Sequence, residues 1–257
     1  MFAQINELIK VIDDAVWGLP LICLIMVTGI LLTVRLGGVQ VRHLGKAFKF
    51  MFQDEEDGHG EVTSFGALCT ALSATIGTGN IAGVATAIAA GGPGALFWMV
   101  VAAFFGMATK YSEGLLAIKY RTIDQDGHVL GGPFYYIENG MGKKWKWLAK
   151  IFAFFGAGVG LFGIGTFTQV NSIASAVKNF FDPDMAHTVT VLGNDYSIAT
   201  VIAGILLTVF VGLVVIGGIK RISKVSEVVV PFMAVLYVVL CLIIVFTNIK
   251  AVPGAFA

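Results

Sequence analysis

Charged residues are scarce in this chain. Only 13% of its 257 residues are Asp, Glu, Lys or Arg, about half the share found in soluble domains. Between Glu61 and Lys110, 48 consecutive residues include no acidic residue, basic residue or histidine. This scarcity excludes an ordinary soluble domain. Because 57% of the residues are hydrophobic and the mean hydropathy is +0.85, the sequence predicts an all-α, polytopic membrane protein.

Other features are also missing from the sequence. A net charge of +1 gives no electrostatic reason to expect nucleic-acid binding. Its three cysteines, an odd number, all fall in apolar segments, which favours small buried residues over a disulfide framework or metal site. The N-terminus has no basic signal-peptide region, so we expect its first apolar segment to remain as a helix. The apolar segments contain no paired carboxylates and no HExxH motif, which disfavours an intramembrane enzyme.

Six segments are long and apolar enough to cross a bilayer. The fourth would be about 50 Å long if wholly helical, so it should tilt strongly or project beyond the bilayer. At the end of the third, Lys110 and Glu113 have the spacing of an ion pair on one helical face. The six predicted spans are residues 17–36, 63–90, 95–118, 148–181, 197–219 and 225–247.

The distribution of basic residues predicts the orientation of these spans. If the chain changes sides at each span, the loops 35–62, 110–150 and 220–224 lie on one side, and they hold 14 of the 17 Lys and Arg residues. Loops rich in Lys and Arg face the cytoplasm. We therefore expect a multi-pass protein of the cell (inner) membrane with its N-terminus outside.

The second predicted span contains a predicted helix break, with the sequence SATIGTGNIAG at residues 73–83. Gly77, Gly79 and Gly83 weaken a helix where lipid would require one, and Thr and Asn are interleaved with them. Unwound backbone inside a membrane persists only where it is covered by protein or lines a cavity. The break is thus the leading candidate site. The alternative is a packing motif, in which small residues let helices approach closely.

Further motifs lie along the chain: GGPGALFWM at 91–99 continuing to Gly106, GTGNI at 77–81, KYSE at 110–113, and GGP with YYIE within 131–138. Together they resemble the motifs of the sodium:alanine symporters, also called the alanine or glycine:cation symporter family. Val100 departs from the family pattern, which usually has a second Trp there, and we expect this difference to alter packing rather than chemistry.

The resemblance implies a leucine-transporter-like fold, in which two inverted repeats of five helices hold the substrate between two broken helices. The first predicted span would be an extra N-terminal helix, and the other five would form the first repeat. A second repeat is absent from the sequence. We therefore expect half of a transporter, either a fragment or a truncated product, whose partner is the missing C-terminal repeat or a second chain.

The break could bind a zwitterionic amino acid without a formal charge. The amides of Gly77, Thr78 and Gly79 can point at its carboxylate, and the side chains of Thr75 and Asn80 supply oxygen atoms. Carbonyls freed near Ser73, Ala74 and Ile76 can bind a small hard cation. The resemblance places the Ser73 and Ile76 carbonyls near one sodium ion, and Asn80 near the substrate or a second sodium ion.

The fourth predicted span adds a polar cluster at residues 166–171 inside a glycine-rich segment. Gln169 could bind the polar end of the substrate, and Phe167 could help close the pocket around a small side chain. The alternative for Gln169 is a hydrogen bond between helices, which such residues form routinely.

The predicted function is therefore sodium-driven uptake of alanine, glycine or a similar small neutral amino acid, with sodium as the coupling ion and no other cofactor. A half-transporter or membrane scaffold without transport activity of its own is the alternative.

Overall fold

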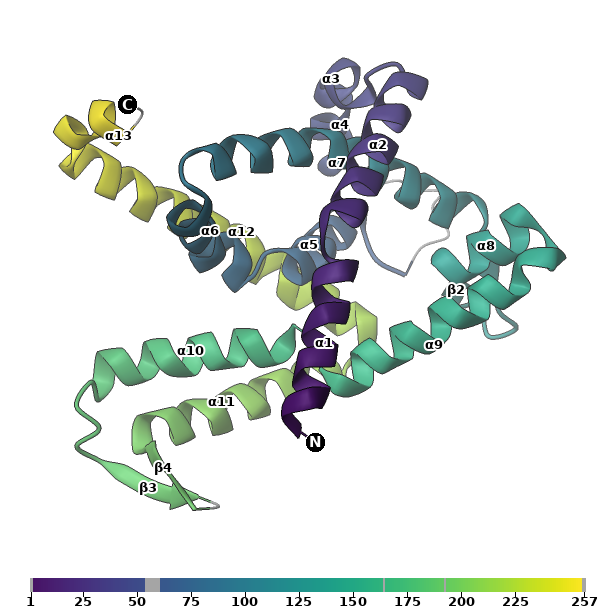
Figure 1. Cartoon of the computed structure of the whole chain (residues 1–257). Helices are drawn as coiled ribbons and strands as arrows, with labels where there is room; N and C mark the ends of the chain where they lie inside the picture. Colours follow the sequence, from purple (N-terminus) through teal and green to yellow (C-terminus); the bar gives the residue numbers. More distant parts are fainter. Residues whose placement is uncertain (1, 54–60, 164, 192, 256–257) are drawn as a thin grey trace. The chain divides into compact units, whose positions relative to one another are not determined.

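The protein is mostly helical and divides into two compact units. The computed structural model describes residues 2–53, 61–163, 165–191 and 193–255 (Figure 1). One unit comprises Met1–Lys49 and Ala82–Phe162, and the other comprises Phe50–Ile81 and Gly163–Ala257. We refer to them as the first and second units.

The first unit is built around a long helix, α7. Helix α2 packs against α7 at Gly29, where an added Cβ would come within about 3 Å of Phe105. Glycine at this position thus allows the two helices to approach closely, which is a common way of packing membrane helices. The elements of this unit are α1 Phe2–Val16, α2 Leu19–Arg35, α3 Val39–Arg42, α4 Leu44–Met51, α6 Val84–Gly91, α7 Gly94–Lys119, β1 Thr122–Ile123, β2 Val129–Leu130, α8 Pro133–Met141, the 3₁₀ helix η2 Lys143–Trp145 and α9 Lys146–Phe162.

The second unit contains two pairs of packed helices, α5 with α12 and α10 with α11. Figure 1 shows α10 and α11 side by side, with an antiparallel hairpin of β3 and β4 at one end of the pair. The elements of this unit are α5 Ser64–Thr75, α10 Thr166–Phe181, β3 Thr188–Val191, β4 Asn194–Ser197, α11 Ile198–Val215, α12 Gly218–Thr247, the 3₁₀ helix η3 Ile249–Ala251 and α13 Val252–Ala255.

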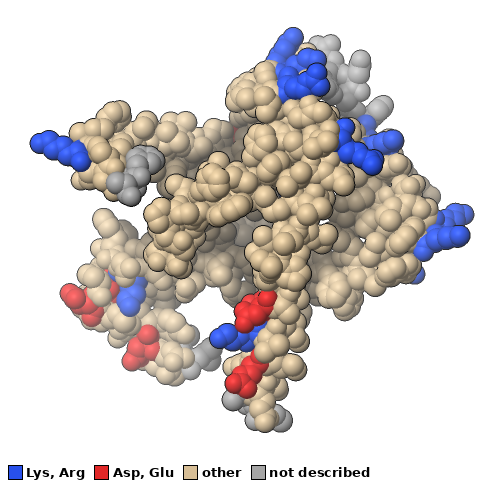
Figure 2. Space-filling model, turned by 45° about the horizontal axis from the view of Figure 1, so that its top comes forward, with Lys and Arg blue, Asp and Glu red and all other residues tan. Residues whose placement is uncertain are grey.

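Most apolar side chains are exposed, and few of the described hydrophobic residues are buried. Most of the visible face in Figure 2 carries neither acidic nor basic side chains. This is the pattern of helices whose apolar faces contact lipid or further protein, because lipid is as apolar as the side chains it covers. The buried hydrophobic residues of the described part are Val39, Cys69, Ala108, Ala149 and Val230.

Five helical stretches of the described residues are long and apolar enough to cross a membrane, and a sixth is obtained if the two helices flanking the residue 76–78 break are counted as one span. The protein is therefore an all-α, polytopic membrane protein in its main architecture, with two small hairpins in its connections. The stretches are Gln4–Arg35, Gly94–Lys119, Lys143–Phe181, Ile198–Val215 and Gly218–Thr247, and the broken pair is Ser64–Thr75 with Gly79–Gly91.

The structure differs from the sequence analysis in the predicted span 148–181. This segment forms two helices, α9 and α10, rather than one continuous helix. The glycines at their junction, Gly163 and Gly165, have positive φ angles of 59° and 89°. Such a conformation is accessible to glycine but does not continue a right-handed helix.

Candidate functional site

The helix break predicted near residues 77–80 is present. Helix α5 begins after Thr63, whose Oγ1 accepts a hydrogen bond from the Gly66 amide at 3.0 Å. It ends at Thr75, because Ile76 adopts an extended conformation with φ −83° and ψ 116°. The chain resumes as a π-helical turn, η1 Gly79–Gly83, and then as α6. Ile76 and Gly77 are therefore not part of a helix.

Two side chains bind the backbone of the break. The Gly77 amide donates to Asn80 Oδ1 at 3.1 Å, and the Thr78 amide donates to Gln169 Oε1 of α10, also at 3.1 Å. In a continuous α-helix these amides would instead donate to the carbonyls of Ser73 and Ala74. The two side-chain amides thus compete with the helix for its hydrogen bonds, and they release two carbonyls at the end of α5.

Gly77 leaves space for the side-chain amide of Gln169. A Cβ built on Gly77 would lie closer than 3.0 Å to the side-chain amide of Gln169. Gly79 is different, because no described atom lies within 4 Å of the position its Cβ would take. The two glycines of the break therefore have separate roles, and only Gly77 makes room for the side chain from α10.

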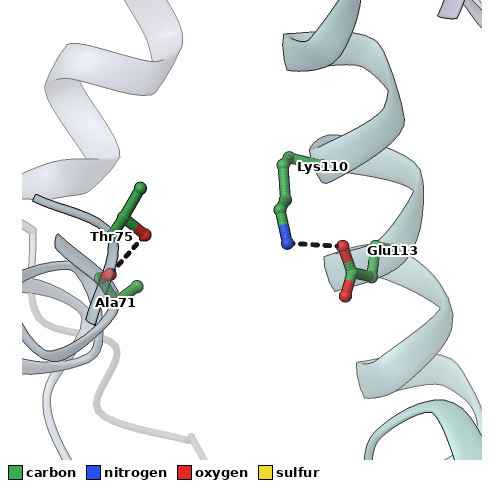
Figure 3. A network of polar contacts seen from close by, with 4 residues as sticks. All are labelled: Ala71, Thr75, Lys110 and Glu113. Carbon is green, nitrogen blue, oxygen red and sulfur yellow. Dashed lines mark hydrogen bonds and ion pairs between the residues drawn. The ribbon is translucent and has the colours of Figure 1, made fainter. Parts of the chain in front are cut away.

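The structure brings Gly77, Thr78, Asn80 and Gln169 together but places other predicted site residues differently. The Thr75 hydroxyl donates to the Ala71 carbonyl at 2.8 Å, within its own helix (Figure 3). Phe167 is 73% exposed, and no described contact joins its ring to the break. The Thr75 hydroxyl is thus used within its own helix, and the contacts to the break come from the two side-chain amides.

Ser73 is connected to another helix. Its hydroxyl donates to the Thr70 carbonyl at 2.7 Å and lies 3.4 Å from Ser226 Oγ of α12, which donates to it. Ala74 and Ile76 lie at the end of the same helix, where the Ile76 amide still donates to the Leu72 carbonyl at 2.8 Å. The last regular hydrogen bond of α5 is therefore the one made by Ile76.

Sequence analysis missed Glu227, an acidic residue of α12. Its Oε1 accepts hydrogen bonds from Thr63 Oγ1 at 3.1 Å and from Ser223 Oγ at 3.5 Å. The signal that could have found it is an ionisable residue inside the predicted span 225–247, since such residues are costly in a membrane and usually have a partner.

The predicted pair of Lys110 and Glu113 is confirmed in the first unit. Lys110 Nζ lies 2.8 Å from Glu113 Oε2 on the surface of α7 (Figure 3). Tyr136 of α8 lies in the field of both charges. Its pKa is raised above the ordinary value, first by burial and then by the negative charge of Glu113, while Lys110 opposes the shift.

A cavity of about 720 Å³ lies elsewhere in the second unit, between α10, α11 and the connection that follows α10. None of residues 73–80 lines it. The lining includes Asp182, whose Oδ2 accepts a hydrogen bond from the buried hydroxyl of Ser197 at 2.6 Å and whose Oδ1 accepts one from the Ala186 amide at 2.7 Å. The Ser197 hydrogen bond is the main reason that the pKa of Asp182 is lowered from its ordinary value.

Long apolar helices and one interrupted span define a polytopic membrane protein with a polar break in its second unit. The sequence profile of the sodium:alanine symporter family matches residues 2–257. The chain therefore belongs to the sodium:alanine symporter family, as the sequence motifs had indicated. This is a family of transporters rather than enzymes.

Similar proteins occur in bacteria and archaea. An uncharacterized transporter of Haemophilus influenzae is 51% identical over 98% of this chain and 51% of its own length. The sodium/alanine symporter AgcS of Methanococcus maripaludis is 47% identical over 97% and 52% of the two chains. The amino-acid carrier protein AlsT of Bacillus subtilis is 36% identical over 98% and 50%. The chain thus spans about half the length of these curated relatives.

Proposed function

We propose that the native protein carries out sodium-coupled symport of a small neutral amino acid, alanine or glycine, into the cell. The observation that carries this proposal is the pair of hydrogen bonds that the amides of Gly77 and Thr78 donate to the side-chain oxygens of Asn80 and Gln169. These bonds hold the helix open in the second span. Family membership and the resemblance to AgcS support cation-coupled amino acid symport in general.

The break suits the carboxylate of an amino acid. Asn80 and Gln169 use their oxygens to bind the backbone, so each keeps its NH₂ group as a donor, and no hydrogen bond of either group occurs within the described residues. Together with the Gly79 amide, these donors would bind the carboxylate. Desolvating a zwitterion without such partners would be prohibitively costly. The Thr75 side chain, whose hydroxyl donates within α5, and Phe167, whose ring is exposed, are the remaining residues of the proposed pocket.

The released carbonyls suit sodium as the co-transported ion. Ser73 and Ala74 have lost the amide donors that a continuous helix would provide, and oxygen atoms are the ligands that hard cations prefer. With the Ile76 carbonyl and Asn80 Oδ1, they would form the protein's contribution to a sodium site. Sodium would organise the break, which the substrate also needs, so each would favour the binding of the other.

The proposed orientation follows the basic loops, with the N-terminus outside the cell. In the proposed arrangement, α2 is an extra helix and the five following spans form one leucine-transporter-like repeat. The activity, substrate and ion are proposed for the whole native protein.

Binding of radiolabelled alanine to the purified native protein tests this function. We expect saturable binding in sodium chloride and a loss of binding when choline replaces sodium, with glycine competing and a large amino acid such as tryptophan failing to compete. Equal binding in both salts would refute sodium coupling. An absence of binding in any salt would favour a membrane scaffold without transport activity.

A further inference from the structure

Glu227 connects α12 to the beginning of α5, the helix that leads into the break. Its Oε1 accepts a hydrogen bond from Thr63 Oγ1, although the two residues are 164 positions apart in the sequence. Thr63 is also the N-cap of α5, and its Oγ1 already accepts a hydrogen bond from the Gly66 amide. The hydroxyl of Thr63 therefore accepts from its own helix and donates to the other.

The surroundings of Glu227 are shaped to admit its carboxylate. A Cβ on Gly66 would lie closer than 3.0 Å to both Glu227 Oε1 and Ser223 Oγ. A side chain at position 66 would therefore displace the Glu227 carboxylate and the Ser223 hydroxyl from these positions. Farther along the two helices, Ser226 donates to Ser73, so polar contacts join α5 to α12 near both ends of α5.

Electrostatics favours a carboxylate at this end of α5. The first turn of a helix carries a partial positive charge from amides that have no partner in the helix. The hydrogen bond from the Thr63 hydroxyl and the partial positive charge at the N-terminus of α5 therefore offset the cost of placing the Glu227 carboxylate in an apolar segment. Pro231 weakens α12 locally, because proline has no amide hydrogen to donate to the backbone carbonyl of Glu227, one turn earlier in the helix.

We propose that Glu227 is a positioning residue for transport, which holds the first turn of α5 against α12 through Thr63. This inference rests on the proposed symport function, because it assigns a role in that cycle. In transporters built from repeats, the site opens when helices move as bodies relative to one another. Movement of α5 away from α12 would require the Thr63–Glu227 hydrogen bond to break, so this bond stabilises the state in which the two helices are packed together.

Cys69 provides a natural reporter of that state. It lies on α5 one turn after Gly66 and is only 1% exposed. When α5 leaves α12, the thiol should become accessible to a membrane-permeant reagent. The experiment uses the native protein in which every cysteine except Cys69, Cys23 and Cys241 among them, is replaced by serine, so that labelling by N-ethylmaleimide reports on Cys69 alone.

Thr63→Val removes the donor to Glu227 and the N-cap acceptor of α5 together, while it keeps the Glu227 charge and the shape of the side chain. Glu227→Ala removes the same contact between the helices and leaves the cap in place, so the two variants separate the effects. We expect Cys69 to react about tenfold faster or more in Thr63→Val, and at the wild-type rate in Thr63→Ser. Glu227→Gln, which keeps an acceptor for Thr63, should react more slowly than Glu227→Ala. Labelling of Thr63→Val at the wild-type rate would overturn the proposal.

Sodium-dependent alanine uptake is measured in parallel on the same proteins. We expect Thr63→Val to lower the maximal rate, and Thr63→Ser to retain it. Faster Cys69 labelling with unchanged uptake would overturn the role in transport. If the wild-type protein takes up no alanine while Thr63→Val still exposes Cys69, then the proposed function fails and the helix contact itself stands.

Discussion

The sharpest test of the candidate site compares alanine at two glycines of the break. Gly77→Ala places a methyl group where the amide of Gln169 lies, whereas Gly79→Ala places it in a position with no described atom within 4 Å. Neither glycine has a positive φ, so alanine introduces no backbone strain at either position. The two variants thus add the same group two residues apart, and differ in whether it displaces Gln169.

The magnitude follows from the hydrogen bond that is lost. In Gly77→Ala the flexible Gln169 side chain must move, which leaves the Thr78 amide without its acceptor. Leaving a buried donor unpaired costs about 1–3 kcal/mol, and Thr78 is only half-buried, so about 1–2 kcal/mol is expected. This corresponds to about a five- to thirtyfold weaker affinity for alanine. Gly79→Ala should change the affinity by less than about twofold.

The assay is sodium-dependent binding of radiolabelled alanine to the purified native protein, with each variant also made in a Gln169→Ala background. If Gly77→Ala acts through Gln169, its effect should disappear in that background, because the side chain it displaces is already gone. An effect of the same size in both backgrounds would refute the reasoning. Equal effects of Gly77→Ala and Gly79→Ala would refute it as well.

Three further predictions concern other parts of the chain. The pKa of Asp182 is lowered by Ser197, so the stability that this carboxylate contributes is present above its ordinary pKa of 3.8 and is lost as the pH falls through the lower folded value. In Ser197→Ala the stability should be lost at higher pH, because the hydrogen bond that lowers the pKa of Asp182 is gone. Amide hydrogen exchange in the connection after α10, measured against pH, would detect this change. An unchanged pH profile would contradict the prediction. Glu113→Gln removes the exposed Lys110–Glu113 ion pair and should lower the stability of the protein by less than about 1 kcal/mol in a thermal melt. A larger loss would contradict the expectation that an exposed ion pair contributes little to stability. Gly29→Ala should overpack the contact between α2 and α7 and destabilise the protein by about 1–3 kcal/mol, which denaturant unfolding in detergent would measure; wild-type stability would show that the helices can separate freely.

Some helix boundaries were predictable because their causes are local. Glycine weakens a helix at any position, so Gly77 and Gly79 predict a break without knowledge of the fold. Because the surrounding segment is apolar, the break also indicates a site that is covered by protein or lines a cavity. The junction between α9 and α10 has the same kind of cause, at Gly163 and Gly165. It was missed because that segment contains many glycines, most of which lie inside helices, and composition alone does not distinguish those that adopt a positive φ.

The amino-acid sequence by itself determined the membrane class, the family and the place where the second span is interrupted, since each depends on hydropathy, local motifs or local backbone preference. The tertiary structure decided which partners complete the break and hold its helix. Gln169 reaches Thr78 across 91 positions and Glu227 reaches Thr63 across 164, and only folding brings such distant residues together. The same packing decides that a methyl group at Gly77, rather than at Gly79, would displace Gln169, because the overlap depends on where α10 places that side-chain amide.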